Sequence, residues 1–278
     1  MSSNYVLAVL ILIPCLLFAA SPTAVMADMP ENPINSGNLQ VVNRNNPLHP
    51  TFKPDNLAEY KGVKLQNNAC TAFTHMLEAM NKDGISNLRL QSAYRPYSYQ
   101  KAIFEQRVKE LVKKGHSKEE ATTITSASIQ HPGASEHQTG LALDVSIDGK
   151  LSQAFADTAA GLWLAENCHK FGFIIRYPKY KTEVTCIIYE PWHLRYVGLP
   201  HAEVMKSMDL TLEEYWCYLK QAQVHYIPGE EGRDYFLLLY SSNLPTEMPH
   251  GTVSISANNT KADAQYIITA RKTHPPLW

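Results

Sequence analysis

Residues 135–144 have the sequence Ser-Glu-His-Gln-Thr-Gly-Leu-Ala-Leu-Asp and lead into Val145-Ser146-Ile147, which is typical of a strand. His137 supplies an imidazole, and Asp144 supplies a carboxylate after a turn-permitting Thr-Gly pair. This spacing allows His137 to lie on a loop and Asp144 on the strand that follows. Both side chains can then point at one metal ion, and we expect the fold to be built around that point.

A second stretch, Tyr189-Glu190-Pro191-Trp192-His193, supplies a third candidate ligand in His193. Two histidines and one carboxylate hold a tetrahedral zinc ion with one position open, which is typical of catalytic sites. Glu190 is then a carboxylate that is free for acid–base chemistry. Because Pro191 follows Glu190, this Glu-x-x-His is predicted at the end of a strand and not on a regular helix.

Arg95 lies just before a proline, which biases it away from the helical region and places it at a strand-to-helix corner. Ser98 is predicted to cap the helix that follows, whose apolar face ends at Val112, and Gln100 lies on its first turn. This position suits a guanidinium that points into a cleft.

The remaining periodicity predicts an α+β fold in which helices pack on a small, largely antiparallel sheet. Residues 113–118 and 121–126 are predicted to form a connecting region with a partial helix. Further helices are predicted at residues 67–81, 155–171, 200–206 and 211–223, and strands at 87–92, 173–177 and 182–189.

Composition divides the chain into four segments. Residues 1–27 form a signal peptide or N-terminal anchor, residues 28–40 a linker, residues 41–217 the metal-binding domain, and residues 218–278 a small β-rich C-terminal extension with three predicted strands.

The first segment is predicted to direct the chain out of the cytoplasm. Residues 5–20 are apolar and uncharged, and Val25-Met26-Ala27 offers a small-residue cleavage site. A cleaved signal and a retained membrane anchor both fit, because the apolar run is near the upper length of a signal and no Lys or Arg precedes it. In either case we expect the protein in the cell envelope, in the periplasm or on the extracellular face.

Export would leave four cysteines in an oxidising compartment, namely Cys70, Cys168, Cys186 and Cys217. Two disulfides and four buried free thiols are both compatible with the sequence. The chain has 278 residues and a formal net charge of -1, so it lacks the basic field that would hold a nucleic acid. The sequence leaves the oligomeric state open.

Three motifs, taken in order, resemble the VanY-type D-alanyl-D-alanine carboxypeptidases. They are Ser-x-x-Arg followed by Gln at residues 92–100, Ser-x-His-x-x-Gly-x-Ala-x-Asp at 135–144, and Glu-Pro-Trp-His at 190–193. These enzymes belong to a wider group of zinc peptidases that includes lysostaphin and the zinc fold of Sonic hedgehog. The resemblance implies a zinc-dependent D,D-carboxypeptidase that removes the C-terminal D-alanine from peptidoglycan stem peptides ending in D-Ala-D-Ala.

The resemblance also implies a role for each site residue. His137, Asp144 and His193 would bind zinc, and Glu190 would act as the general base and then as the proton donor to the leaving amine. Arg95 would stabilise the oxyanion or hold the substrate carbonyl.

Ser135 and Gln100 would help to hold the terminal D-alanine and its carboxylate. The alternatives are a D-Ala-D-Ala dipeptidase or a peptidoglycan endopeptidase with the same zinc centre. A non-catalytic zinc module that only binds peptide is a third alternative, but binding alone needs no base beside an open zinc position.

Overall fold

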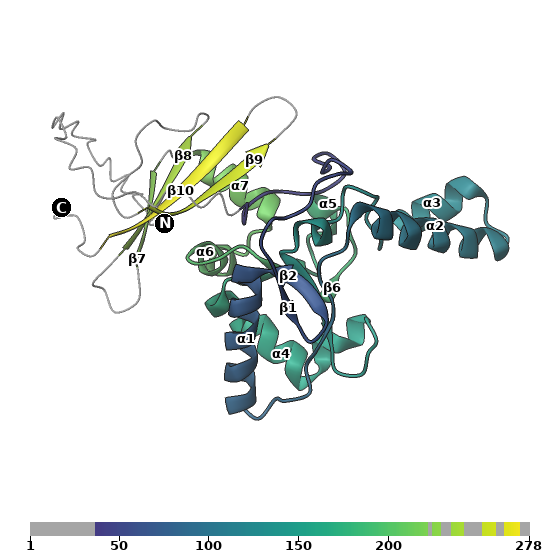
Figure 1. Cartoon of the computed structure of the whole chain (residues 1–278), viewed down its shortest axis with the longest axis horizontal. Coiled ribbons are helices and arrows are strands. Elements are labelled where there is room, and N and C mark those ends of the chain that lie inside the picture. Colours follow the sequence, from purple (N-terminus) through teal and green to yellow (C-terminus); the bar gives the residue numbers. More distant parts are fainter. Residues whose placement is uncertain (1–36, 222–223, 229–234, 242–251, 260–263, 273–278) are drawn as a thin grey trace, which may run out of the picture. The chain divides into compact units, whose positions relative to one another are not determined.

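The two metal-binding stretches lie on neighbouring strands of a four-stranded antiparallel sheet in the computed structural model (Figure 1). The sheet order is β3 (Arg89–Ser92), β4 (Ala142–Ser146), β6 (Glu190–Tyr196) and β5 (Phe173–Tyr177). Helices pack against this sheet, so the predicted α+β class is confirmed.

The structure describes residues 37–221, 224–228, 235–241, 252–259 and 264–272. The expected signal peptide or anchor and most of the expected linker lie outside these ranges. None of the helices within them is both long and apolar enough to cross a membrane.

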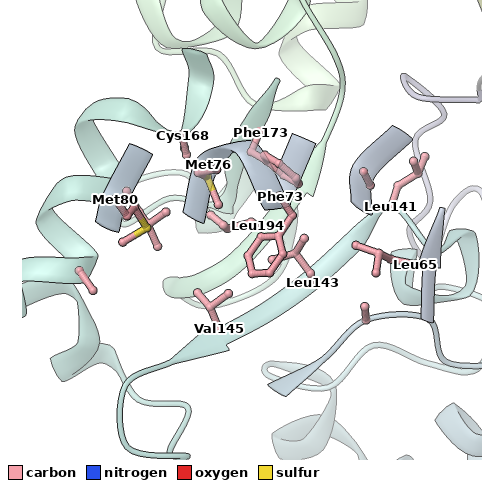
Figure 2. Close-up of a cluster of buried hydrophobic side chains, with 14 of the residues drawn as sticks. Leu65, Phe73, Met76, Met80, Leu141, Leu143, Val145, Cys168, Phe173 and Leu194 are labelled. Atoms are coloured by element: carbon pink, nitrogen blue, oxygen red, sulfur yellow. The ribbon is translucent and has the colours of Figure 1, made fainter. Parts of the chain in front are cut away.

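Helix α1 (Asn67–Lys82) forms because apolar residues recur at helical spacing along one face. Phe73, Met76 and Met80 on that face are fully buried against Leu143 of β4 and Leu194 of β6. Figure 2 shows these side chains pointing toward one another from the helix and the strands. Truncating a buried aromatic ring such as Phe73 to alanine typically costs about 3–5 kcal/mol. This core holds the strands that carry the site.

A helical pair, α2 (Tyr97–Lys113) and α3 (Lys118–Ser126), follows the corner at Arg95. The predicted cap at Ser98 is wrong, because α2 begins at Tyr97 and Pro96 occupies the N-cap position. Residues 118–126 form a complete helix rather than a partial one. A reciprocal pair of hydrogen bonds between Ser117 and Glu120 caps its start.

The single helix predicted over residues 155–171 is divided in the structure. A short turn η2 (Gln153–Asp157) precedes α4 (Ala159–Asn167), and η3 (Cys168–Phe171) completes the run. Thr158 separates η2 from α4 because its side chain caps α4 by accepting a hydrogen bond from the Gly161 amide.

The strand predicted over residues 182–189 is wrong. A one-turn helix, α5 (Thr182–Thr185), ends at Cys186 in the left-handed conformation, and the chain then runs irregularly into β6. A short hairpin also escaped prediction. It joins β1 (Leu57–Tyr60) to β2 (Val63–Gln66) through a two-residue turn.

The C-terminal part begins with α6 (His201–Ser207) and α7 (Leu212–Gln221). A second antiparallel sheet follows, in the order β7 (Val224–Pro228), β8 (Tyr235–Ser241), β10 (Ala264–Lys272) and β9 (Thr252–Asn259). It therefore has one strand more than the three predicted. His201 joins the sheet to the helices, because its two ring nitrogens lie 2.9 Å from the Tyr215 hydroxyl and 3.0 Å from the Thr269 hydroxyl.

All four cysteines in the described residues are free thiols, so the interpretation with two disulfides is not supported. Cys168 is buried, and burial raises the pKa of its thiol to about 12. Cys186 and Cys217 are exposed.

Candidate active site

Strand register brings two of the predicted ligands together. Asp144 on β4 lies directly opposite His193 on β6, and side chains at opposite positions of an antiparallel pair project to the same face. An oxygen of Asp144 lies 3.0 Å from Nδ1 of His193. Ser92, opposite Asp144 on the other neighbouring strand, donates a 2.7 Å hydrogen bond to its second oxygen.

His137 reaches the same point from a short 3-10 turn, η1 (Glu136–Thr139). The turn ends at Gly140, which adopts the left-handed conformation with a φ of +71°, and this conformation favours glycine. Nδ1 of His137 lies 2.7 Å from the carbonyl oxygen of Ala93, and this bond orients the other nitrogen, Nε2, toward Asp144 at 3.2 Å. A carbonyl partner of this kind fixes the tautomer of a metal-binding histidine.

These three side chains fit a metal ion. One ligand atom from each of His137, Asp144 and His193 can be chosen so that all lie within 4.8 Å of one another, and all three residues are buried. Nε2 of His137 has no hydrogen-bond partner within the described residues, although it is buried. A buried nitrogen left without a partner beside a carboxylate is expected where an ion completes the site. The set of two imidazoles and one carboxylate is one that zinc accepts.

The charges at this point are strongly coupled. Burial, followed by the positive charge of Arg95, lowers the pKa of His137 to about 4. Burial opposes ionisation of Asp144, but the two histidines outweigh it and hold its pKa well below the usual range. Burial likewise opposes protonation of His193, yet the carboxylates of Asp144, Glu136 and Glu190 raise its pKa to about 9. The ionised Asp144 therefore contacts both a weakly basic imidazole, His137, and a strongly basic one, His193.

Glu190 lies at the start of β6, with a carboxylate oxygen 3.8 Å from Nδ1 of His193. Its side chain is 9% exposed. Burial and, to a lesser degree, the nearby charge of Asp144 raise the pKa of Glu190 to about 7. A carboxyl group in this range can take up and release a proton near neutral pH, which is what a general base and acid requires.

Arg95 follows β3 at the corner before α2, as predicted, and its amide donates to the carbonyl of His137. Its Nη2 lies 3.6 Å from Asp144, and its Nε is buried without a hydrogen-bond partner among the described residues. The guanidinium therefore carries a donor that is available beside the predicted metal position.

Ser135 and Gln100, the two predicted substrate-binding residues, are both buried. Ser135 immediately precedes η1. Gln100 lies on the first turn of α2, where its amide nitrogen donates a 2.7 Å hydrogen bond to the carbonyl of Gln130. Its carbonyl oxygen has no partner within the described residues. Their role in substrate binding stays a prediction.

One functional neighbour was missed by the sequence reasoning. Glu136 is buried behind His193, with Oε2 3.5 Å from Nε2 of that ring. Its other oxygen, Oε1, accepts hydrogen bonds from Arg176 at 2.7 Å and Arg195 at 2.9 Å. The signal was that each arginine stands alone in an apolar strand sequence, which indicates a buried charge in need of a partner. The sequence could not show that Glu136 is that partner.

A family model described as VanY, D-alanyl-D-alanine carboxypeptidase, matches residues 62–199. The putative carboxypeptidase YodJ of Bacillus subtilis (strain 168) is 40% identical over 204 residues, which cover 69% of this chain and 70% of that protein. The bifunctional D-Ala-D-Ala dipeptidase and D-Ala-D-Ala carboxypeptidase VanXYC of Enterococcus gallinarum is 35% identical over 192 residues, which cover 66% of this chain and 95% of that protein.

Solved structures agree with this match. The vancomycin-resistance D,D-pentapeptidase VanY of a VanB-type cassette, in complex with Zn(II), is 35% identical with a TM-score of 0.58 and covers 65% of this chain and 99% of its own. VanYB in complex with D-alanine-D-alanine is 35% identical with a TM-score of 0.59, and the match covers 65% of this chain and 97% of that one. The LD-carboxypeptidase LdcB is 38% identical with a TM-score of 0.58, and the match covers 66% of this chain and 87% of that one.

Proposed function

The chain belongs to the VanY family of D-alanyl-D-alanine carboxypeptidases, and from this premise we propose that it trims the terminal D-alanine from peptidoglycan stem peptides in the cell envelope. It is a zinc metallopeptidase, as the zinc-bound relative and the His-Asp-His group together indicate. The observation that carries the proposal is the buried group of His137, Asp144 and His193 with a protonatable Glu190 beside it.

His137, Asp144 and His193 hold the zinc ion in this proposal. When bound, zinc polarises the scissile carbonyl and lowers the pKa of a water molecule at its open position. Glu190 would remove a proton from the attacking water, because its carboxylate lies 3.8 Å from the ligand His193 and burial raises its pKa to about 7. It then passes that proton to the leaving amino group of D-alanine.

Arg95 offers a fixed positive charge where negative charge develops on the scissile carbonyl oxygen. Its backbone amide donates to the carbonyl of His137 and its Nη2 lies 3.6 Å from Asp144, so the guanidinium loses little freedom during the reaction. In this proposal Ser135 and Gln100 help to hold the terminal D-alanine and its carboxylate. The proposed location in the cell envelope is supported by the apolar N-terminal segment and by the presence of stem peptides there.

The test is mass spectrometry of the products from a stem pentapeptide ending in D-Ala-D-Ala, using zinc-loaded protein and a chelator-treated control. Zinc-dependent loss of one alanine supports the proposal. Free D-Ala-D-Ala is assayed in parallel, because the relative VanXYC is named as both a dipeptidase and a carboxypeptidase. Cleavage of the dipeptide alone, or an internal cut in the peptide, would replace the proposed reaction with one of the alternatives.

A second candidate is L,D-carboxypeptidase activity, which the 38% identity to LdcB favours. The same assay decides between them when it includes a stem tetrapeptide whose terminal D-alanine follows an L-residue. Faster cleavage of the tetrapeptide than of the pentapeptide would assign the chain to the L,D-specific reaction.

A further inference from the structure

A buried network of charges lies beside the predicted zinc ligand His193, at its Nε2 nitrogen. Its centre is Glu136, with Arg176 from β5 and Arg195 from β6, and all three side chains are at most 1% exposed. Arg176 also binds Glu213 on α7 through two nitrogens, at 2.6 and 2.9 Å. Burying an unpaired charge costs several kcal/mol of folding free energy. Each member of this network therefore needs a partner of opposite charge or a hydrogen-bond partner.

The two oxygens of Glu136 have different partners. Oε1 accepts hydrogen bonds from both arginines, while Oε2 receives neither and lies 3.5 Å from Nε2 of His193. Neither Oε2 nor this Nε2 has a hydrogen-bond partner within the described residues, although both are buried. The 3.5 Å contact therefore leaves both atoms available for a hydrogen bond to each other.

The opposite nitrogen of His193 faces the site. Nδ1 lies 3.0 Å from Asp144 and 3.8 Å from Glu190, so a metal ion held with Asp144 would bind this nitrogen. An imidazole can donate its Nδ1 lone pair to a metal only when its proton is on Nε2. A carboxylate aimed at Nε2 stabilises that tautomer.

We propose that Glu136 is a positioning residue that accepts the Nε2 proton of His193 and thereby fixes the ring to bind zinc through Nδ1. Arg176 and Arg195 both donate hydrogen bonds to Oε1, which leaves Oε2 free for this contact. The site thus holds its two histidines by different means, a backbone carbonyl behind His137 and a buried carboxylate behind His193. The inference rests on the zinc site of the proposed function but does not depend on its substrate.

The variant Glu136→Gln tests the proposal through zinc affinity. The two arginines can donate only to the amide oxygen, so the amide nitrogen must face Nε2 of His193, where it favours the tautomer protonated on Nδ1. Loss of such a partner weakens metal binding by about 10–100-fold. Zinc affinity is measured by competition with a chromogenic chelator, without any substrate, so an error in the assigned peptidase reaction would not affect the result.

Two further variants separate positioning from general stability. Glu213→Gln removes the negative charge and one of the two acceptor oxygens that Arg176 contacts on α7, but it leaves every contact of Glu136 in place. It should therefore lower the unfolding temperature of the metal-free protein while zinc affinity stays close to wild type. Glu136→Asp keeps the charge beside both arginines but withdraws it from His193 by one methylene. It should fold and still bind zinc more weakly, which provides the answer if Glu136→Gln does not fold.

The tautomer itself can be read in the wild-type protein by nitrogen-15 NMR of the histidine rings. In zinc-loaded protein we expect His193 to carry its proton on Nε2 and His137 to carry it on Nδ1. Zinc bound through Nε2 of His193 would overturn the proposal, and so would wild-type zinc affinity in a folded Glu136→Gln or Glu136→Asp protein.

Discussion

Replacing Glu190 with glutamine should abolish turnover and, at the same time, stabilise the metal-free protein at alkaline pH. Burial raises the pKa of Glu190 from its ordinary value of 4.5 to about 7. The folded protein therefore favours the neutral carboxyl group more strongly than the unfolded chain does. The stability that this group contributes is complete below pH 4.5 and is lost as the pH rises through about 7.

The size of the effect follows from the two pKa values. The difference between 4.5 and about 7 corresponds to about 3 kcal/mol of unfolding free energy at pH 8. An amide of nearly the same shape cannot ionise, so Glu190→Gln does not lose this stability. We expect the variant and the wild type to be similar in stability near pH 4, to diverge between pH 4.5 and about 7, and to stay apart by about 3 kcal/mol at pH 8.

The assay is urea unfolding of metal-free wild type and Glu190→Gln at a series of pH values, followed by circular dichroism. Zinc supplies the internal control, since a cation beside Glu190 favours the carboxylate and should shrink the gap between the two proteins. A stability difference that does not change with pH would refute the reasoning, because it would show that Glu190 does not titrate differently in the folded and unfolded states. Full peptidase activity in the variant would remove Glu190 from its proposed catalytic role.

Three other changes test different parts of the structure. Arg95→Ala should lower kcat by about 10²–10³-fold with zinc still bound, whereas Arg107→Ala on the exposed face of α2 should have no effect; equal kinetics in both would place Arg95 outside the reaction. Gly161→Ala places a Cβ against the carbonyl oxygen of Phe155 and should destabilise the protein by about 3 kcal/mol. Thermal unfolding measures this loss, and an unchanged Tm would show that η2 and α4 can move apart without cost. The exposed thiol of Cys186 should react with a disulfide reagent in native protein without prior reduction, and a lack of reaction that reduction reverses would reveal a disulfide.

The three metal ligands could be predicted from the sequence because local rules determine where each side chain points. His137 follows from a turn that ends at Gly140, while Asp144 and His193 follow from strands whose alternation sets the inward face. The amphipathic spacing of α1 was equally informative. Their convergence on one point depends on strand pairing, and it was the resemblance to known motifs that made this pairing predictable.

The failures have physical causes that lie outside the local sequence. Residues 182–189 are rich in β-branched side chains, which favour a strand by propensity. The structure overrides this preference because the amide of Ile188 donates to the carbonyl of Ala127, at the end of α3 and outside any strand, and Cys186 adopts a positive φ. Glu136 was missed for a similar reason, since the arginines that determine its role lie 40 and 59 residues away in the chain.

The residues just before position 41 determine where the chain can be truncated without damage to the catalytic part. Arg195 donates to the carbonyl oxygens of Asn38 and Gln40, and Trp216 donates to that of Leu39, whose side chain is completely buried. A truncated chain that starts at Val41 would leave the Arg195 guanidinium without two acceptors, at a cost of about 1–3 kcal/mol for each unsatisfied buried donor. Tags and protease cleavage sites therefore belong upstream of residue 37, where a cut spares these contacts.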